Sequence, residues 1–301
     1  MNITNANNTK LITVFTPAYN RAHTLPRTYE SLCAQSSKDF VWLIVDDGSV
    51  DNTAELVKKW QGEDVGFEIR YIYKENGGMH TAHNTAYENI DTELNVCIDS
   101  DDKLADGAIE AIARKWEAVR DKGYAGIIAL DADFDGKIIG KGFPDDLAET
   151  TLSGYYAAGG AGDKKLVYRT DVIRSYPEYP TFEGEKYVSL AYKYLLIDQS
   201  HKLAVLNKVL CNVDYLPDGS TNSMFREYLK NPRGFAFWRK IRMTYPDSTK
   251  RLVVDCIHYC SSSMISKNRA YIKESPKKFL TILCTPFGFL LTIYIKRKAK
   301  Q

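Results

Sequence analysis

The sequence predicts an α/β fold with a largely parallel sheet, followed by a helical and basic C-terminal region. In the first half, short apolar runs typical of buried strands alternate with segments whose apolar residues have helical spacing. Such alternation is typical of βαβ units. Polar clusters rich in Asp and Asn follow three of the apolar runs. Because open α/β sheets bind ligands beyond the carboxyl ends of their strands, these clusters predict a ligand site.

Each predicted element rests on its own run of residues. The strands of the first half are Leu11–Phe15, Val41–Val45, Ile69–Tyr73, Leu94–Ile98 and Gly126–Leu130. The helices between them are Leu25–Ala34, Ala54–Trp60, Met79–Asn89 and Ala105–Lys122. The less regular middle predicts a turn at Asp133–Gly142, strands at Leu166–Tyr168 and Leu203–Val213, and a helix over 185–197. Further on, Phe225–Tyr245 and Leu252–Tyr271 are predicted to be helices.

Composition supports a folded chain with two regions. The 301 residues are 44% hydrophobic and 26% charged, which excludes wholesale disorder. Charge is distributed unevenly, because residues 1–225 contain 23 Lys and Arg against 34 Asp and Glu, whereas residues 226–301 contain 17 against 4. We therefore place a domain boundary at 225/226 and expect the basic end to meet an anionic surface.

The segment Phe279–Ile295 contains no charge and is bounded by basic residues on both sides. It is slightly short for a spanning helix, and Pro286 and Gly288 interrupt it. We expect residues 279–298 to make peripheral contact with a membrane as an interfacial or shallow re-entrant segment. A buried core helix and a full span are the alternatives.

The cysteines and the first residues predict the compartment. The six cysteines are scattered singly, without a CxxC pair or a dense disulfide spacing. Residues 1–10 are polar and lack the basic start and apolar run of a signal peptide. We expect a reduced, cytoplasmic setting, peripheral on the inner face of the membrane. The aromatics of the basic region are explained by helix packing or an interfacial belt, so no nucleic acid partner is expected.

The strongest motif for chemistry is the cluster Asp99-Ser100-Asp101-Asp102 after the fourth apolar run. Three carboxylates in four residues repel one another unless a cation lies among them. Mg²⁺ typically takes one or two carboxylates together with substrate phosphates. The cluster predicts a divalent metal site, and the alternative is an exposed acidic turn that caps the next helix.

Three further polar clusters accompany it. The run VDDGSVDNT places Asp46 and Asp47 at a strand end, where they could accept hydrogen bonds from a base or a ribose, while Asp51 or Asn52 could cap the next helix. The run TPAYNR begins at Thr16 and contains a proline that stiffens the loop. The run NGGMHTAHN has two glycines that permit close backbone approach and open a helix whose N-terminus favours anions.

The order TPAYNR, VDDGSVDNT, NGGMHTAHN and IDSDD resembles family 2 of the glycosyltransferases, the inverting enzymes of the GT-A fold. The resemblance is specific over residues 11–105 and looser to about residue 222. It implies a GT-A domain over 1–225, with a sheet flanked by helices, and a helical basic extension over 226–301. It also implies that Asp214–Asn222 is similar to a loop that closes over the donor in some members.

The resemblance implies roles for residues of all four motifs. Thr16 and Tyr19 would lie near the base, Asp47 would accept from the uracil edge, and Asp102 would be the most direct ligand of Mn²⁺ or Mg²⁺, with Asp101 beside it. His83 stands where the family usually has an arginine near the donor, which is a departure from the pattern. The implied nucleotide-sugar-binding residues are Thr16, Pro17, Tyr19, Asn20, Asp46, Asp47, Gly77, His83, Asp99, Ser100 and Asp101.

The general base of the family stands on a loop before a helix, often within a Glu-Asp pair. Here the segment TFEGEKY resembles that loop, with Lys186 in place of the Asp. The resemblance implies Glu185 as the base and Glu183 as its substitute. The alternative is an acidic turn that caps the following helix.

The implied function is a metal-dependent inverting glycosyltransferase with a UDP-sugar donor and a glycan or lipid-linked acceptor, acting in surface polysaccharide synthesis. One alternative is a catalytically inactive membrane-bound protein that binds nucleotide-sugars or glycans, because Lys186 departs from the pattern. The other is a sugar-1-phosphate nucleotidyltransferase, which would need a glycine-rich basic loop after the first strand; residues 16–21 contain no glycine.

Overall fold

The computed structural model describes residues 10–214 and 224–300 and divides the chain into two compact units. The first unit comprises residues up to 76, 82–177 and 195–214, and the second comprises 77–81, 178–194 and 215–301. Residues 226–301, the predicted second domain, all belong to the second unit, which also takes in residues 77–81, 178–194 and 215–225 of the predicted first domain. Most of the Asp214–Asn222 loop lies outside the described residues.

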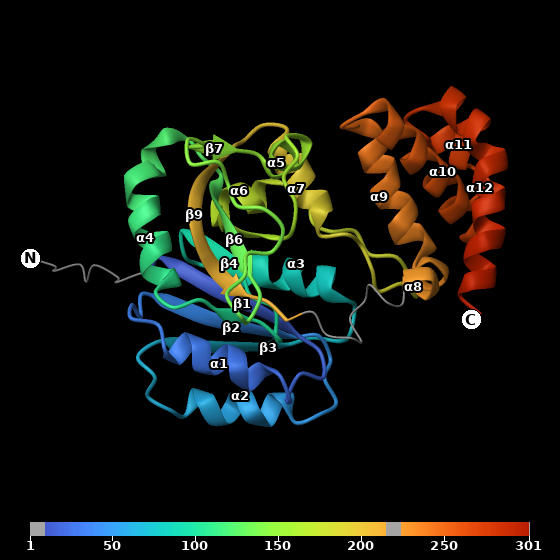
Figure 1. Ribbon diagram of the computed structural model, residues 1–301. Coiled ribbons are helices and arrows are strands. Elements are labelled where there is room, and N and C mark those ends of the chain that lie inside the picture. Colours follow the sequence, from blue (N-terminus) through green and yellow to red (C-terminus); the bar gives the residue numbers. More distant parts are fainter. Residues whose placement is uncertain (1–9, 215–223, 301) are drawn as a thin grey trace, which may run out of the picture. The chain divides into compact units, whose positions relative to one another are not determined.

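A nine-stranded sheet forms the centre of the first unit (Figure 1). Its strands are β1 (Ile12–Ala18), β2 (Phe40–Asp46), β3 (Glu68–Tyr73), β4 (Leu94–Cys97), β5 (Lys103–Leu104), β6 (Gly126–Ala132), β7 (Glu149–Thr150), β8 (Lys164–Arg169) and β9 (Leu203–Asn212). The order is β3-β2-β1-β4-β8-β6-β9-β5, with β7 paired to β9. The α/β fold class and the strands predicted in the first half are confirmed.

The first four strands are parallel, whereas the other half of the sheet is mixed. β8 runs antiparallel to both of its neighbours, β4 and β6, and β6 is parallel to β9. In the parallel half, Ala18 is in register with Asp46, and Asp46 with Tyr73. The carboxyl ends of β1, β2 and β3 therefore meet at one edge, which is where two of the polar clusters begin.

Helices connect the strands, and aromatic residues fill the space under two of them. The helices that belong wholly or partly to the first unit are α1 (Leu25–Cys33), α2 (Thr53–Gln61), α3 (Met79–Asn89), α4 (Ala108–Val119, continued by a 3₁₀ turn at Arg120–Lys122), α5 (Leu152–Ala157), α6 (Thr170–Ser175) and α7 (Ala191–Asp198). The rings of Tyr29 and Trp60 stack with centroids 4.3 Å apart, and Trp42 lies against both. Burial of these rings anchors α1 and α2 to β2.

The second unit is helical. Its helices are α8 (Met224–Lys230), α9 (Pro232–Thr244), α10 (Thr249–Ile265), α11 (Tyr271–Glu274) and α12 (Lys278–Lys298). Asp255 on α10 is buried and accepts hydrogen bonds from Arg239 at 2.6 Å and Arg242 at 2.7 Å, both on α9. A buried carboxylate paired with two guanidinium groups fixes how α9 and α10 pack.

Several predicted helices differ from the observed ones, for local reasons. The predicted helix Phe225–Tyr245 is broken into α8 and α9 at Pro232, which lacks the amide hydrogen that a continuous helix needs. The predicted helix 185–197 begins only at Ala191, and in the non-helical chain before it Lys186 N donates to Asn231 Oδ1. In contrast, α12 continues through Pro286 and Gly288 without interruption.

Candidate active site

The TPAYNR cluster at the end of β1 and the VDDGSVDNT cluster at the end of β2 are hydrogen-bonded to each other. Asn20 adopts a left-handed conformation, with φ of 53°. Its backbone N donates to Ser49 Oγ at 2.8 Å, and its Oδ1 accepts from Val50 N at 2.9 Å. Gly48 turns the second loop at φ of 85°, where an added Cβ would lie 2.8 Å from Asn76 N. These contacts give both loops one fixed shape.

The paired acids of the second cluster have different surroundings. Asp46 is completely buried and accepts from Ser49 N at 2.7 Å and from the Tyr71 hydroxyl at 2.6 Å. Burial and this bond to Asp46 raise the pKa of Tyr71, so the phenol stays protonated. Asp47 instead pairs with Lys74 Nζ at 2.5 Å. Asp46 therefore supports the loop, whereas Asp47 carries an ion pair beside it.

The residues predicted near the base also differ in their surroundings, since some are buried and one is exposed. Thr16 is fully buried within β1, where its Oγ1 accepts from Trp42 Nε1 at 3.0 Å, and Pro17 is buried beside it. Tyr19 follows the strand and is 48% exposed. A side chain without exposed surface cannot contact a nucleotide in this conformation. Thr16 therefore holds Trp42 in the core, Tyr19 has an exposed ring that is available for stacking, and the expected places of both near the base stay predictions.

The acid cluster directly follows β4. Asp102 is buried, and its backbone oxygen accepts from Thr28 Oγ1 at 2.8 Å, while the oxygen of Asp101 accepts from Arg27 at 3.1 Å. The Arg27 guanidinium also pairs with Asp214 at 2.9 Å, and Asp214 N donates to Asp102 Oδ1 at 3.3 Å. Helix α1 and Asp214, which follows β9, thus both hold this loop in place.

Sequence reasoning missed two buried charges next to the acid cluster. Lys165 on β8 lies with its Nζ 3.9 Å from Asp131 Oδ1 on β6 and donates to the Cys97 oxygen at 3.4 Å. The negative charges of Asp131, Asp102 and Asp99 raise the pKa of Lys165 despite its burial. Asp131 stands in the otherwise apolar strand sequence GIIALDA. A charged residue in such a strand was the signal that could have identified it.

The electrostatics of this region favour a cation. Burial, with the neighbouring charges of Asp99 and Asp101, raises the pKa of Asp102 to about 7, against the opposing effect of Lys165. Burial and Asp99 likewise raise the pKa of Asp101. Several carboxylates with too little compensating charge suit a hard divalent ion that takes oxygen ligands. In the described part of the chain, no group of three His, Cys, Asp or Glu residues is arranged to hold a metal.

His83 does not lie on the surface of this site. It is buried beneath Phe15, whose ring it meets edge-on at 5.0 Å, and its Nδ1 lies 3.2 Å from the Tyr87 hydroxyl. Its Nε2 lies 3.7 Å from the Cys97 sulfur, which in turn lies 3.8 Å from Asp99 Oδ1. His83 thus packs behind Asp99, and its expected role as a donor contact stays a prediction.

The glycine-rich loop and the predicted base belong to the second unit. Gly77 and Gly78 lie in its segment 77–81, and a Cβ on Gly78 would lie 2.0 Å from the Lys186 oxygen, so only glycine fits there. Glu185 Oε1 accepts from the backbone N of Arg233 at 3.0 Å and from its Nε at 3.0 Å, and Oε2 accepts from Gly234 N at 2.9 Å. The Glu185 side chain is 6% exposed, whereas Glu183 is exposed. Glu185 therefore caps α9, rather than the helix that follows it.

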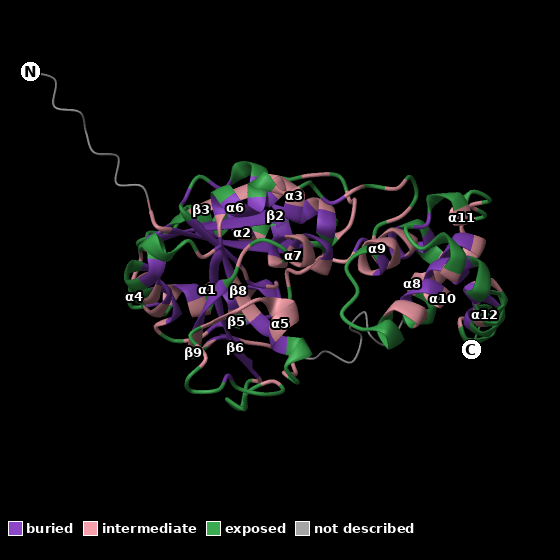
Figure 2. Ribbon diagram, turned by 90° about the horizontal axis from the view of Figure 1, so that it is seen from above, coloured by how far each residue is buried: buried purple, intermediate pink, exposed green. Residues whose placement is uncertain are grey.

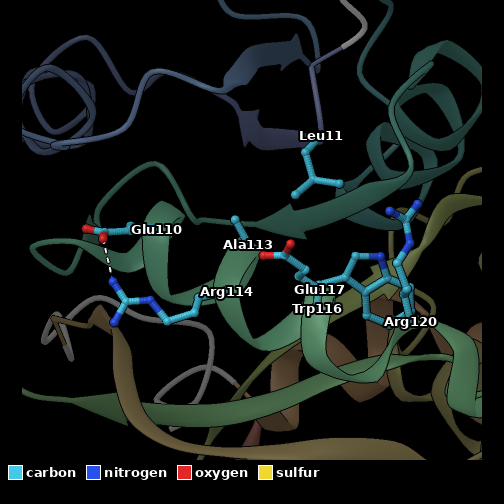
Figure 3. Close-up of a pocket in the computed structure, with 7 residues that line it drawn as sticks. All are labelled: Leu11, Glu110, Ala113, Arg114, Trp116, Glu117 and Arg120. Carbon is cyan, nitrogen blue, oxygen red and sulfur yellow. Dashed lines mark hydrogen bonds and ion pairs between the residues drawn. The ribbon is translucent and has the colours of Figure 1, made fainter.

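Two surface hollows are lined by residues outside the acid cluster. One, shown in Figure 3, lies along α4 between Leu11 and residues such as Trp116 and Arg120. Leu11 precedes β1, so this hollow is at the opposite end of the strand from the polar clusters. The other lies wholly in the second unit and is lined by Phe182, Arg233, Ala236, Phe237, Lys240, Tyr259, Ser266, Asn268 and Glu274.

Solved structures with similar folds define the class of protein. The structure of S. aureus TarS 1-349 in complex with UDP-GlcNAc matches with a TM-score of 0.58 at 14% identity, over 97% of this chain and 92% of that one. A mannosyltransferase of Pyrobaculum calidifontis, in complex with GDP-Man and Mn²⁺, matches with a TM-score of 0.55 at 15% identity, over 96% and 83%. At this level of identity the likeness concerns the fold, which is the GT-A type, as expected.

Sequence similarity narrows the class to a family. The sequence model described as "Glycosyl transferase family 2" matches residues 13–155, which contain all four motifs. A hyaluronan synthase of Pasteurella multocida is 31% identical over 139 residues, which is 46% of this chain and 14% of that protein. A GalNAc(5)-diNAcBac-PP-undecaprenol beta-1,3-glucosyltransferase of Campylobacter jejuni is 25% identical over 171 residues, 54% of this chain and 53% of that protein. Residues 13–155 of the chain, which carry all four motifs, belong to glycosyl transferase family 2.

The lengths covered limit what these relatives imply. The chain spans 14% of the hyaluronan synthase and 53% of the Campylobacter glucosyltransferase. Family membership confirms the resemblance seen in the motifs and counts against a nucleotidyltransferase. The donor, the acceptor and the metal of this chain are proposals, which follow.

Proposed function

We propose that this chain is a metal-dependent inverting glycosyltransferase that transfers a sugar from a UDP-sugar to a glycan or lipid-linked acceptor in surface polysaccharide synthesis. The observation that carries the proposal is the pairing of Asp47 with Lys74 at one strand end and, at another, the buried Asp102 beside the partly buried Asp101, within a GT-A sheet. Relatives named for hyaluronan synthesis and for an undecaprenol-linked acceptor support the acceptor class. A cytoplasmic location is part of the proposal.

In the proposed donor complex, each loop has one task. Asp47 accepts a hydrogen bond from the uracil edge, and Lys74 keeps its carboxylate oriented. Tyr19 covers the base, and Asn20 holds the two loops at a fixed spacing. Asp99, with Ser100, faces the ribose. Asp101 and Asp102 would hold Mn²⁺ or Mg²⁺, which would supply Lewis-acid stabilisation of the diphosphate charge.

The proposed reaction is a single displacement at the anomeric carbon. The acceptor oxygen forms the new bond to that carbon while the bond to the nucleoside diphosphate breaks. The acceptor proton passes to a carboxylate of the Glu183–Glu185 loop, a step that contributes about 10²- to 10⁴-fold. Glu185 remains our predicted base, although its hydrogen bonds to α9 leave Glu183 as the more accessible carboxylate.

Calorimetric titration tests the donor class. UDP, GDP and dTDP are each titrated into the full chain with Mn²⁺ and, separately, with EDTA. We expect binding of UDP that requires Mn²⁺. Preference for GDP or dTDP would overturn the UDP assignment, and equal binding in EDTA would overturn the metal assignment. Binding of UDP-sugars without turnover of any of them would favour the inactive binding protein.

A further inference from the structure

Helix α12 has two faces of opposite character. Its buried residues recur every three or four positions, as one side of a helix does. They are Thr281, Cys284, Gly288, Thr292 and Ile295. This face packs on α10 (Figure 1).

The packed face is shaped specifically for α10. A Cβ on Gly288 would lie 2.4 Å from Cys260 Cβ, so the two helix backbones approach closely there. The hydroxyls of Thr292 and Ser261 lie 2.9 Å apart and share a hydrogen bond. Near the other end, Thr281 is buried and its hydroxyl lies 2.6 Å from that of Ser275. These contacts fix which side of α12 turns outward.

The outward face is almost entirely apolar. Its large hydrophobic residues are exposed by between 36% and 75% (Figure 2). They are Phe279, Ile282, Leu283, Phe287, Phe289, Leu290, Ile293 and Tyr294. The helix is long and apolar enough to cross a membrane by length and composition, but only 28% of its most apolar window is buried. A core helix would be mostly buried, and a contiguous exposed patch of this kind marks an interaction surface.

Charge identifies the occupant of that surface. Exposed cations stand at both ends of the helix, with Lys277 and Lys278 before the apolar run and Lys296, Arg297 and Lys298 after it. No acidic residue occurs between positions 278 and 298. Two copies meeting through this face would bring like charges together in a parallel pair and in an antiparallel pair alike. An anionic lipid surface instead attracts both ends at once.

We propose that α12 lies in the plane of an anionic membrane surface, with its exposed apolar face among the acyl chains and its packed face on α10. A helix in this orientation keeps both cationic ends at headgroup level, and the hydroxyl contacts of the packed face stay within the protein. The same geometry argues against a full span, which would strip α12 from α10. Because anionic lipids concentrate on the cytoplasmic leaflet, the inner face of the membrane is the proposed location.

Vesicle sedimentation of the full chain tests this proposal. The probes are vesicles of POPC alone and of POPC mixed with POPG. We expect tight binding to the mixed vesicles, weaker binding to POPC, and release of the anion-dependent part by salt. The double variant Ile282→Asp, Leu290→Asp should bind at least about tenfold more weakly, because two apolar side chains lose their insertion. Neutralising Lys296, Arg297 and Lys298 to Gln should weaken binding about fivefold per charge, and only to the mixed vesicles.

The matched control is Ile138→Asp, the same change at an exposed isoleucine of the first unit. It should bind vesicles like the wild type. Unchanged binding of the α12 double variant, with its helical content and melting temperature retained, would overturn the proposal. If the wild type is an oligomer without lipid and the double variant is a monomer, the occupant of the apolar face would be a second copy of the chain. Resistance to carbonate extraction would show a span. Vesicle binding is measured without any sugar donor. Failure of the membrane proposal can therefore be distinguished from failure of the proposed glycosyl transfer.

Discussion

At the scale of single residues, the acid cluster carries the most direct prediction. Asp102→Asn removes the buried charge expected to hold the metal, so the Mn²⁺-dependent part of UDP binding should weaken by at least about tenfold, the lower bound for losing even an indirect contact. Calorimetry with Mn²⁺ and with EDTA measures it. Asp106→Asn, an exposed acid just after the cluster, is the control and should bind normally. Retained Mn²⁺ dependence in the Asp102 variant would refute the ligand assignment.

The two candidate bases can be separated by combining stability with kinetics. Glu185 caps α9 through three hydrogen bonds, so Glu185→Gln should lower the free energy of unfolding by about 1–2 kcal/mol. If Glu185 is also the base, kcat falls by far more than this loss of folded protein explains. Glu183→Gln should leave stability unchanged, since Glu183 is exposed. A collapse of kcat in the Glu183 variant, with normal kcat in the Glu185 variant, would move the assignment to Glu183.

A histidine of the second unit predicts how stability depends on pH. Burial, together with the nearby Arg239, lowers the pKa of His258 to about 4, against the opposing effect of Asp255. The unfolded state therefore binds the proton more readily than the folded state between about pH 6.5 and 4. Stability should fall as pH falls through that window, by on the order of 3 kcal/mol, since one pKa unit is worth about 1.4 kcal/mol.

Thermal unfolding of wild type and His258→Gln at several pH values checks this. The variant keeps a polar side chain that does not titrate, so its stability should fall less steeply between pH 6.5 and 4. Parallel curves for the two proteins would mean that other groups cause the acid sensitivity.

At the scale of elements, the contact between α10 and α12 depends on one glycine. Gly288→Ala would place a methyl 2.4 Å from Cys260 Cβ and 3.1 Å from Ser261 N, so the helices would have to separate. We expect a loss of about 1–3 kcal/mol, typical of overpacking, although Ala is ordinarily the better helix former. Gly142→Ala, where an added Cβ meets nothing within 4 Å, is the control for denaturant unfolding. A stabilised Gly288 variant would contradict the close packing.

The elements also show why the strands were predicted better than the helices. Strands β1, β2 and β4 are buried apolar runs, so composition alone identifies them. Helix boundaries were harder to predict: α7 begins only at Ala191, and the non-helical chain before it is bonded to the distant Asn231 through Lys186 N. The strand directions in the mixed half of the sheet were also not predictable from local sequence. The residues of β8 do not indicate that both of its neighbours will be antiparallel to it.

At the scale of the whole molecule, the two compact units predict a selective response to ligand. UDP with Mn²⁺ at about 100 times its dissociation constant should stabilise the unit that binds it by about 2.7 kcal/mol. That corresponds to roughly 5–10 °C in a unit of this size. Scanning calorimetry should show this shift in a transition of the first unit, and hydrogen exchange should assign it to residues 10–76 and 82–177. An equal shift throughout would mean that the units unfold as one.

The sequence alone determined the family, the polar clusters at the strand ends, and the uncharged run with basic flanks near the C-terminal end. All of these depend on residues that are adjacent in the chain. Only the tertiary structure decided which members of each cluster are accessible. Thr16 and His83 proved to be buried under Trp42 and Phe15, and Asp131 and Lys165 joined the acids from strands far along the chain. Burial and charge pairing arise between distant segments, so a motif names the candidate residues, whereas the packing around them assigns their roles.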